Sequence, residues 1–195
     1  MSDKYDANRD RVLRVAAELF AKSGYHGTGI ADLGTAVGLG RGALYHYIGS
    51  KEAILYEISC RRLTQLNSIA DESALTEADP EIRLRGLARA LMRDIAGHRA
   101  EWTVFFREHH ALTGERRDRV IAERERFESH WRHALEQGVR DGRFRALPRL
   151  MAKGLLGMFN YSYVWMNPGD RETPDEIADA FLDTVITGMR SGEHA

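Results

Sequence analysis

Proline is rare in this chain, and its four copies stand at positions 80, 148, 168 and 174. Outside these points apolar residues recur every three or four positions, and no long segment alternates apolar and polar residues as a half-buried strand does. Proline interrupts helices, so a chain with so few prolines can be helical over most of its length. The pattern predicts an all-α protein of about nine helices.

Composition narrows the class of protein. The chain has 195 residues, 43% hydrophobic and 29% charged, with a formal net charge of −1, as in ordinary globular proteins. No apolar run approaches the roughly 18 residues that span a bilayer, and the N-terminus lacks the apolar stretch of a secretory signal. The single cysteine, Cys60, excludes an internal disulfide. We therefore expect a cytoplasmic protein with no membrane partner, and any nucleic-acid partner must be recognised from local features.

Start and stop signals divide the first part of the chain into short helices. Ser23 and Gly24 end a first helix over residues 7–22, and Thr28 is a suitable N-cap for a second. The glycine turn at 38–40 then leads into a third helix over 41–47, and Ser50 caps a long fourth helix. The signals predict three short helices followed by a long one.

Five further helices are predicted in the rest of the chain. The last has the strongest start signal, because Thr173, Pro174 and Glu176 form a capping box with proline at the first helical position. The expected spans are 80–96, 100–112, 113–141, 148–166 and 174–189.

The segment GLGRGALYHYIGSKEAIL, residues 38–55, carries the functional signal. Two helices joined by a short glycine turn follow the helix-turn-helix plan, in which the second helix enters the DNA major groove. Successive helical residues point about 100° apart, so Tyr45, His46 and Tyr47 cannot all be core residues. Outward phenol and imidazole groups are typical phosphate donors, and Lys51 stands at a helix N-terminus that already favours an anion.

The N-terminal 55 residues resemble the TetR (tetracycline-repressor-like) family of bacterial transcription regulators. The matching segments are FAKSGY at 20–25, TGIADL at 28–33 and VGLGRGALYHYIGSKEAIL at 37–55. The resemblance implies a helix-turn-helix DNA-binding domain over residues 1–50. A long helix would join it to a helical ligand-binding and dimerisation domain over residues 51–195.

The resemblance also assigns DNA contacts to individual residues. Gly40 stands where the family usually has a serine cap, and Ala43 where Thr or Ser is common, so Arg41 becomes the main candidate for reading a base, a guanine. Half-buried packing between helices is the alternative for Tyr45 and Tyr47. The full set of predicted DNA-contacting residues is Thr28, Arg41, Gly42, Ala43, Tyr45, His46, Tyr47 and Lys51.

Aromatic residues in the second part of the chain indicate an effector site. Bulky rings leave shaped gaps that a hydrophobic, lipid-derived or aromatic molecule could fill, with His109 and Tyr161 as hydrogen-bonding groups. The predicted ligand-binding set is Trp102, Phe106, His109, Phe127, Trp131, Phe159 and Tyr161. Packing of the same rings into a solid core, in a DNA-binding protein without an effector, is the alternative.

An acyl-coenzyme A thioester is the second choice of effector. The segment YSYVWMNPG at 161–169 resembles one found in TetR-like regulators of lipid and steroid breakdown, some of which respond to such thioesters. Val164 and Asn167, however, stand where those relatives often carry arginine. Arg149 and Lys153 could substitute for these arginines.

The last two helices are predicted to form a homodimer. Amphipathic helices at the end of a chain can pair with their symmetry mates as a four-helix seam. The predicted interface residues are Leu155, Met158, Ile177, Phe181 and Val185.

Together these features predict a ligand-responsive transcription regulator, a repressor that binds double-stranded DNA at a pseudo-palindromic operator and leaves it when the effector binds. We expect no enzymatic activity, no cofactor and no metal. The alternative is a small helical enzyme or metal-binding protein. It would use His109, His110, His130 and His133.

Overall fold

The computed structural model describes residues 2–167, 169 and 171–190, and most of these residues lie in helices. These residues form ten α-helices and one 3-10 helix, and their only extended pairing is an isolated bridge between Phe144 and Arg190. The predicted all-α class is confirmed. None of these helices is long and apolar enough to cross a membrane.

The helices group into two compact units. The first unit contains the described residues up to Leu63 together with His98–Ala122, and the second contains Thr64–Gly97 and the described residues from Glu123 onward. The first unit holds α1 (Ser2–Ser23), α2 (Ile30–Val37), α3 (Arg41–Ile48), α6 (Arg99–Glu108) and the 3-10 helix η1 (His109–Ala111). The second holds α5 (Pro80–Gly97), α8 (Met151–Asn160), α9 (Ser162–Trp165) and α10 (Pro174–Met189). Two long helices, α4 (Lys51–Thr76) and α7 (Gly114–Arg140), contribute residues to both units.

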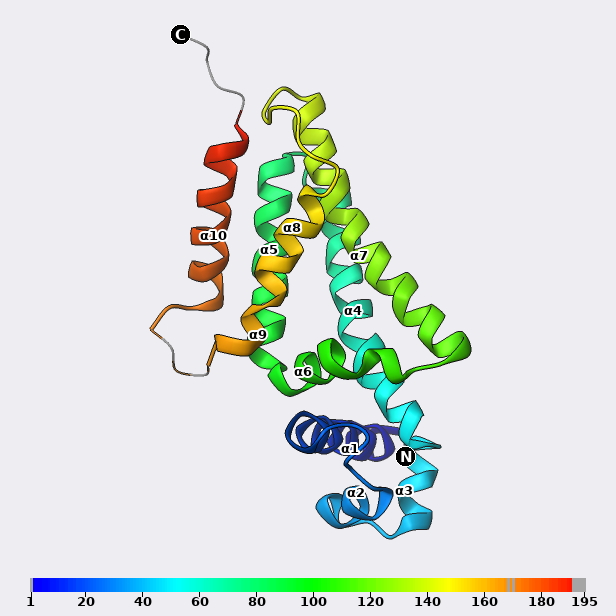
Figure 1. The fold of residues 1–195 in the computed structure, drawn as a ribbon. Coiled ribbons are helices and arrows are strands. Elements are labelled where there is room, and N and C mark those ends of the chain that lie inside the picture. The colour runs from blue at the N-terminus through cyan, green and yellow to red at the C-terminus, as the bar shows by residue number, and fades with distance from the viewer. Residues whose placement is uncertain (1, 168, 170, 191–195) are drawn as a thin grey trace. The chain divides into compact units, whose positions relative to one another are not determined.

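In the first unit, α1 packs against α2, α3 and α6 (Figure 1). Its apolar face is fully covered, since Val12, Ala16 and Phe20 expose at most 1% of their surface. Leu33 of α2 and Leu44 of α3 are completely buried. Helix α1 begins at Ser2, five residues before its predicted start. The polar first turns are held by α3, because the ring of Tyr5 lies 5.0 Å from that of Tyr47.

One of the two predicted N-caps in this unit is confirmed and the other is wrong. Ser50 caps α4 as expected, because its Oγ accepts the amide of Ala53 at 3.0 Å. Thr28 was predicted to cap α2, and this is wrong: Gly29 is the N-cap. The Thr28 hydroxyl instead donates to the carbonyl of Gly24 at 2.9 Å, in the turn between α1 and α2.

In the second unit, α10 lies along α5 (Figure 1). The predicted capping box is confirmed, since the Glu176 amide donates to Thr173 Oγ1 at 3.2 Å and the Thr173 amide donates to Glu176 Oε2 at 2.7 Å. Trp131 and Phe159, with ring centroids 5.5 Å apart, are completely buried. This unit therefore has an aromatic core of its own.

Two further predicted helices differ from the observed ones. The predicted helix over 148–166 starts only at Met151 and consists of α8 and α9, and the predicted helix over 100–112 ends at Glu108 before η1. The segment between α7 and α8 is held by Phe144, which is buried. The amides of Arg143 and Phe144 both donate to the Gly138 carbonyl at 3.0 Å. The chain is thereby folded back onto the end of α7.

Candidate nucleic-acid interface

Helix α3 presents one exposed face and one buried face. Leu44 and Ile48 lie in the core of the first unit. The exposed residues are Arg41, Gly42, Ala43, Tyr45 and His46, all of which were predicted to contact DNA. The polar groups of α3 are therefore available on the side opposite the core.

The turn before α3 is tight. Gly38 has φ +68°, a left-handed conformation that favours glycine, and its amide donates to the carbonyl of Thr35. At Gly34 a methyl group would lie 2.9 Å from the Leu39 carbonyl oxygen, so the backbone approaches closely. Beside this turn lies a hollow of about 700 Å³ lined by Gly29, Ile30, Ala31, Gly34, Thr35 and 38–41. Most of these side chains are small, which leaves backbone accessible to a phosphate or a groove wall.

Arg41 and Tyr45 lie one turn apart and contact each other. The Arg41 guanidinium carbon is 5.8 Å from the centroid of the Tyr45 ring, within the range of a cation–π contact. Stacking on a ring restricts the guanidinium, while its N–H edges stay free to donate hydrogen bonds. This is a suitable arrangement for a side chain that reads a guanine in the major groove.

Helix α1 supports α3 through polar contacts that the sequence did not reveal. Tyr5 donates its hydroxyl hydrogen to the His46 carbonyl at 3.2 Å, and Asn8 Nδ2 donates to the Tyr47 hydroxyl oxygen at 3.3 Å. Arg11 donates to the carbonyl of Val37, the last residue of α2, at 3.0 Å. Tyr47 is half-buried. The packing alternative therefore describes Tyr47 better than the outward phosphate contact, whereas Tyr45 is 37% exposed.

Lys51 begins α4 and lies over an aromatic ring. Its ammonium is 4.4 Å from the centroid of the Tyr25 ring. Burial lowers the pKa of Lys51, an effect that the carboxylate of Glu108 opposes. Glu108 also accepts the Tyr25 amide at 3.2 Å. Lys51 is thus held in one place beside α3.

Thr28 has a different environment from the other predicted DNA contacts. It is only 2% exposed, and its hydroxyl is already bonded within the first unit. We therefore leave the Thr28 side chain out of the DNA-contacting set.

The chain matches two family descriptions over most of its length. Residues 12–58 match the bacterial regulatory proteins of the tetR family. Residues 77–189 match the Tetracyclin repressor-like C-terminal domain. The first match contains α2, the turn and α3, and the second covers more than half of the chain. The chain belongs to the TetR family. It is accordingly a DNA-binding transcription regulator, and the predicted family is confirmed.

Several TetR-family relatives cover nearly the whole chain. The repressor KstR2 of Mycobacterium tuberculosis is 27% identical over 192 residues, 97% of this chain and 96% of that protein. Its solved structure has a TM-score of 0.88, covering 94% of this chain and 95% of that one. PfmR of Thermus thermophilus is 36% identical with a TM-score of 0.85, covering 93% of this chain and all of that one. AibR, solved with isovaleryl coenzyme A and operator DNA, is 27% identical with a TM-score of 0.80. The match covers 91% of this chain and 97% of that one.

The predicted effector-binding residues fall into two aromatic groups, one in each unit. In the first, Trp102 and Phe106 are stacked with centroids 5.5 Å apart. His109 stacks on Phe105, and its Nδ1 lies 2.8 Å from the Phe105 carbonyl oxygen. These residues pack on one another, so their role in ligand binding remains a prediction.

In the second unit, the Trp131 ring contacts Phe127 at 6.4 Å and Phe159 at 5.5 Å. The Trp131 indole N–H is buried and has no acceptor among the described residues. Such a donor costs free energy unless something accepts its hydrogen bond. Tyr161, in contrast, is 62% exposed.

Helices α8 and α10, which are predicted to form the dimer, have both buried and accessible side chains. Leu155 and Ile177 are buried within the second unit, at 2% and 9% exposure, so we leave them out of the proposed interface. Met158, Phe181 and Val185 are half-buried. The outer face of α8 and α10 carries small residues: Gly154, Gly157, Ala180, Thr184 and Gly188.

The four histidines of the alternative hypothesis have ordinary surroundings. His130 lies 3.5 Å from Asp71, and burial lowers its pKa. His110 and His133 are exposed. No group of three His, Cys, Asp or Glu side chains that could hold a metal occurs among the described residues.

Proposed function

We propose that this protein is a ligand-responsive repressor that binds a pseudo-palindromic operator as a homodimer. The exposed face of α3 is the observation that carries the proposal, because Arg41, Tyr45 and His46 project from a helix whose other face is fixed in the core. The KstR2 relatives are transcriptional repressors, which supports repression rather than activation.

The contacts divide into two kinds. Arg41 reads a base edge, with Gly42 and Ala43 admitting close approach of the groove floor. Tyr45, His46 and Lys51 contact phosphates, which position the helix without reading sequence. Tyr5, Asn8 and Arg11 act indirectly, because they fix α3 and the end of α2 from α1.

Effector response would be a population shift. The effector binds the second unit better in a conformation in which the two α3 helices of the dimer are wrongly spaced for successive major grooves. Helix α4 carries Lys51 at its first residue and contributes its later residues to the second unit. It is therefore suited to connect effector binding with DNA release. We place this activity in the cytoplasm and assign the protein no catalytic step.

The effector is proposed to be largely apolar. Trp131, Phe127 and Phe159 supply aromatic surface, and the unpaired indole N–H of Trp131 is available to an acceptor. That AibR was solved with isovaleryl coenzyme A supports an acyl-bearing molecule as one candidate.

Selection of bound duplexes from a random DNA pool tests the proposal. We expect enrichment of an inverted repeat, bound by two chains, whose affinity falls with salt as phosphate contacts require. Small-molecule competition on the selected duplex would then identify compounds that release it. Failure to enrich any sequence would contradict the proposal, as would enrichment of sites without dyad symmetry.

A further inference from the structure

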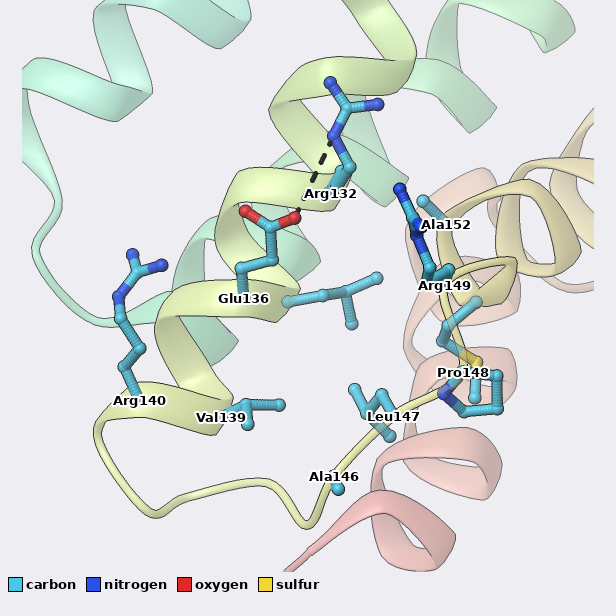
Figure 2. A pocket seen from close by; sticks show the side chains of 11 residues that line it. Arg132, Glu136, Val139, Arg140, Ala146, Leu147, Pro148, Arg149 and Ala152 are labelled. Atoms are coloured by element: carbon cyan, nitrogen blue, oxygen red, sulfur yellow. Dashed lines mark ion pairs between the residues drawn. The ribbon is translucent and has the colours of Figure 1, made fainter.

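The second unit contains a pocket that the DNA-binding role does not use. It has a volume of about 550 Å³, within the roughly 300–1,000 Å³ of small-molecule sites. It lies between the last turns of α7 and the segment that returns from α7 into α8 (Figure 2). No residue from either aromatic group lines it.

The inner walls of this pocket are apolar. The lining residues Leu135 and Ala152 are buried. Val139 and Leu147 face each other from α7 and from the returning segment (Figure 2). Burying methylene groups on such surface is favourable, and the gain grows with the number of groups buried. An unbranched acyl chain is the kind of molecule that such walls accommodate.

The rim carries positive charge. Arg132 on α7 and Arg149 on the opposite wall lie at the same end of the pocket, while Arg140 lies farther along α7 (Figure 2). The only acidic lining residue is Glu136, whose Oε1 is 4.0 Å from Arg132 Nε, too far for a hydrogen bond. Arg149 and Arg140 have no acidic partner among the described residues. The lining therefore has an excess of positive charge at its mouth.

Other arginines of this unit, unlike Arg149, pair with carboxylates. Arg89 meets a carboxylate with two hydrogen bonds, at 2.9 and 2.7 Å, and Arg143 pairs with Asp79 at 2.8 Å. A planar guanidinium is suited to binding a carboxylate or phosphate. Arg149 retains that capacity at the entrance of an apolar pocket.

We propose that this pocket binds an amphipathic anion, with its acyl chain between Val139 and Leu147 and its carboxylate or phosphate between Arg132 and Arg149. This assigns the effector to the pocket between α7 and the returning segment, in place of the buried aromatic group around Trp131, a step that rests on the proposed ligand response. The arginines at the rim select the anionic head group, and the apolar walls select the acyl chain of the same molecule.

Calorimetric titration of the full chain with three probes tests the site. Decanoate carries a carboxylate, decanoyl-coenzyme A carries phosphates, and decan-1-ol has the same chain without charge. We expect one or both anions to bind at least about tenfold more tightly than the alcohol, and the difference to shrink at high salt. The better anion identifies the source of the head group.

Variants locate the binding. Arg149→Ala and Arg132→Ala are expected to weaken the anion about three- to tenfold each and to leave the alcohol unchanged. Arg124→Ala is the matched control, because Arg124 is an exposed arginine of α7 outside the pocket. Leu147→Glu should abolish binding of all three probes, and thermal melting would verify that it folds.

Three results would overturn the proposal. The first is equal binding of alcohol and anions, and the second is no difference between Arg149→Ala and Arg124→Ala. The third is absence of binding, with the pocket variants changing only the oligomeric mass, which would make this surface an interface between copies. Anion binding that leaves the selected operator complex intact would refute the effector assignment alone. Absence of operator binding, with the pocket still occupied, would refute the repressor function and leave the binding site standing.

Discussion

Arg89 on α5 and Asp179 on α10 form a two-pronged ion pair, in which Nε and Nη2 donate to the two carboxylate oxygens at 2.9 and 2.7 Å. Arg85 meets Asp183 one turn away at 2.7 Å, and Arg93 meets Asp175 one turn in the other direction. Arginines spaced four apart on one helix thus face aspartates spaced four apart on the other. This ladder favours the observed register of α10 on α5, because a shift of one turn would leave a charge at one end without its partner on the other helix.

A double-mutant cycle would measure the interaction between Arg89 and Asp179, the central ion pair. We expect Arg89→Ala and Asp179→Ala to show a coupling free energy of about 0.5–1 kcal/mol, kept small because both side chains are partly exposed. Urea unfolding of the wild type, both single variants and the double variant supplies the values. Strict additivity of the two single effects would show that the pair contributes nothing to stability.

Gly138 is the position on α7 where alanine should be harmful. A methyl group there would overlap with the ring of Phe144, so Gly138→Ala should destabilise the protein by about 1–3 kcal/mol. Gly86→Ala on α5 is the control, because its methyl group would meet only Ser73 Oγ at 3.9 Å. Ordinary helix propensity should make that control more stable by about 0.5–1 kcal/mol. Equal effects of the two substitutions in thermal unfolding would contradict the packing of Phe144 on Gly138.

His130 should make stability depend on pH. Burial lowers its pKa, assisted by the charges of Arg126, His133 and Arg83 and opposed by Asp71. The unfolded state therefore takes up a proton near pH 6.5, before the folded state does. The stabilisation is present above about pH 6.5 and is lost as pH falls through that value toward the lower folded pKa.

His130→Gln should consequently flatten the fall in unfolding free energy between about pH 7.5 and 5. His110→Gln, at an exposed position that does not contribute to the pKa of His130, is the control. Parallel pH profiles for wild type and His130→Gln would refute this role.

The proposed dimer interface on α10 can be tested at an exposed threonine. Thr184→Arg places a long charged side chain among the small residues of α8 and α10, and we expect it to shift the sedimenting mass from dimer to monomer. Thr76→Arg on α4 is closely matched, because both hydroxyls donate to the carbonyl four residues earlier, at 2.9 Å. A dimer that tolerates Thr184→Arg as well as Thr76→Arg would place the interface elsewhere.

The helices and their class were predictable because they depend on local signals. Ser50 and Thr173 cap the helices that they were expected to cap, and Leu44 and Ile48 fall on the buried face of α3. The exposed residues of α3 follow from the same periodicity. These features need only spacing along the chain.

Features that depend on distant residues were missed. Thr28 carries a good capping hydroxyl, but that hydroxyl bonds to the carbonyl of Gly24 instead. Helix α8 begins at Met151 rather than at Pro148, and the segment before it packs Phe144 against Gly138. Tyr5 and Asn8 are ordinary polar residues in sequence, and only the packing of α1 on α3 gives them a role. Nothing in the local pattern predicts such contacts.

We propose that α3 recognises a specific DNA sequence through Arg41 while Lys51 binds the DNA backbone. Titration of the selected duplex and a scrambled duplex of equal length, at several salt concentrations, tests it most directly. We predict that Lys51→Ala weakens both complexes and lowers the salt slope by about one per subunit, whereas Arg41→Ala loses about 1–3 kcal/mol on the selected duplex alone. Equal affinity of the wild type for both duplexes, or equal losses on both with Arg41→Ala, would contradict the account.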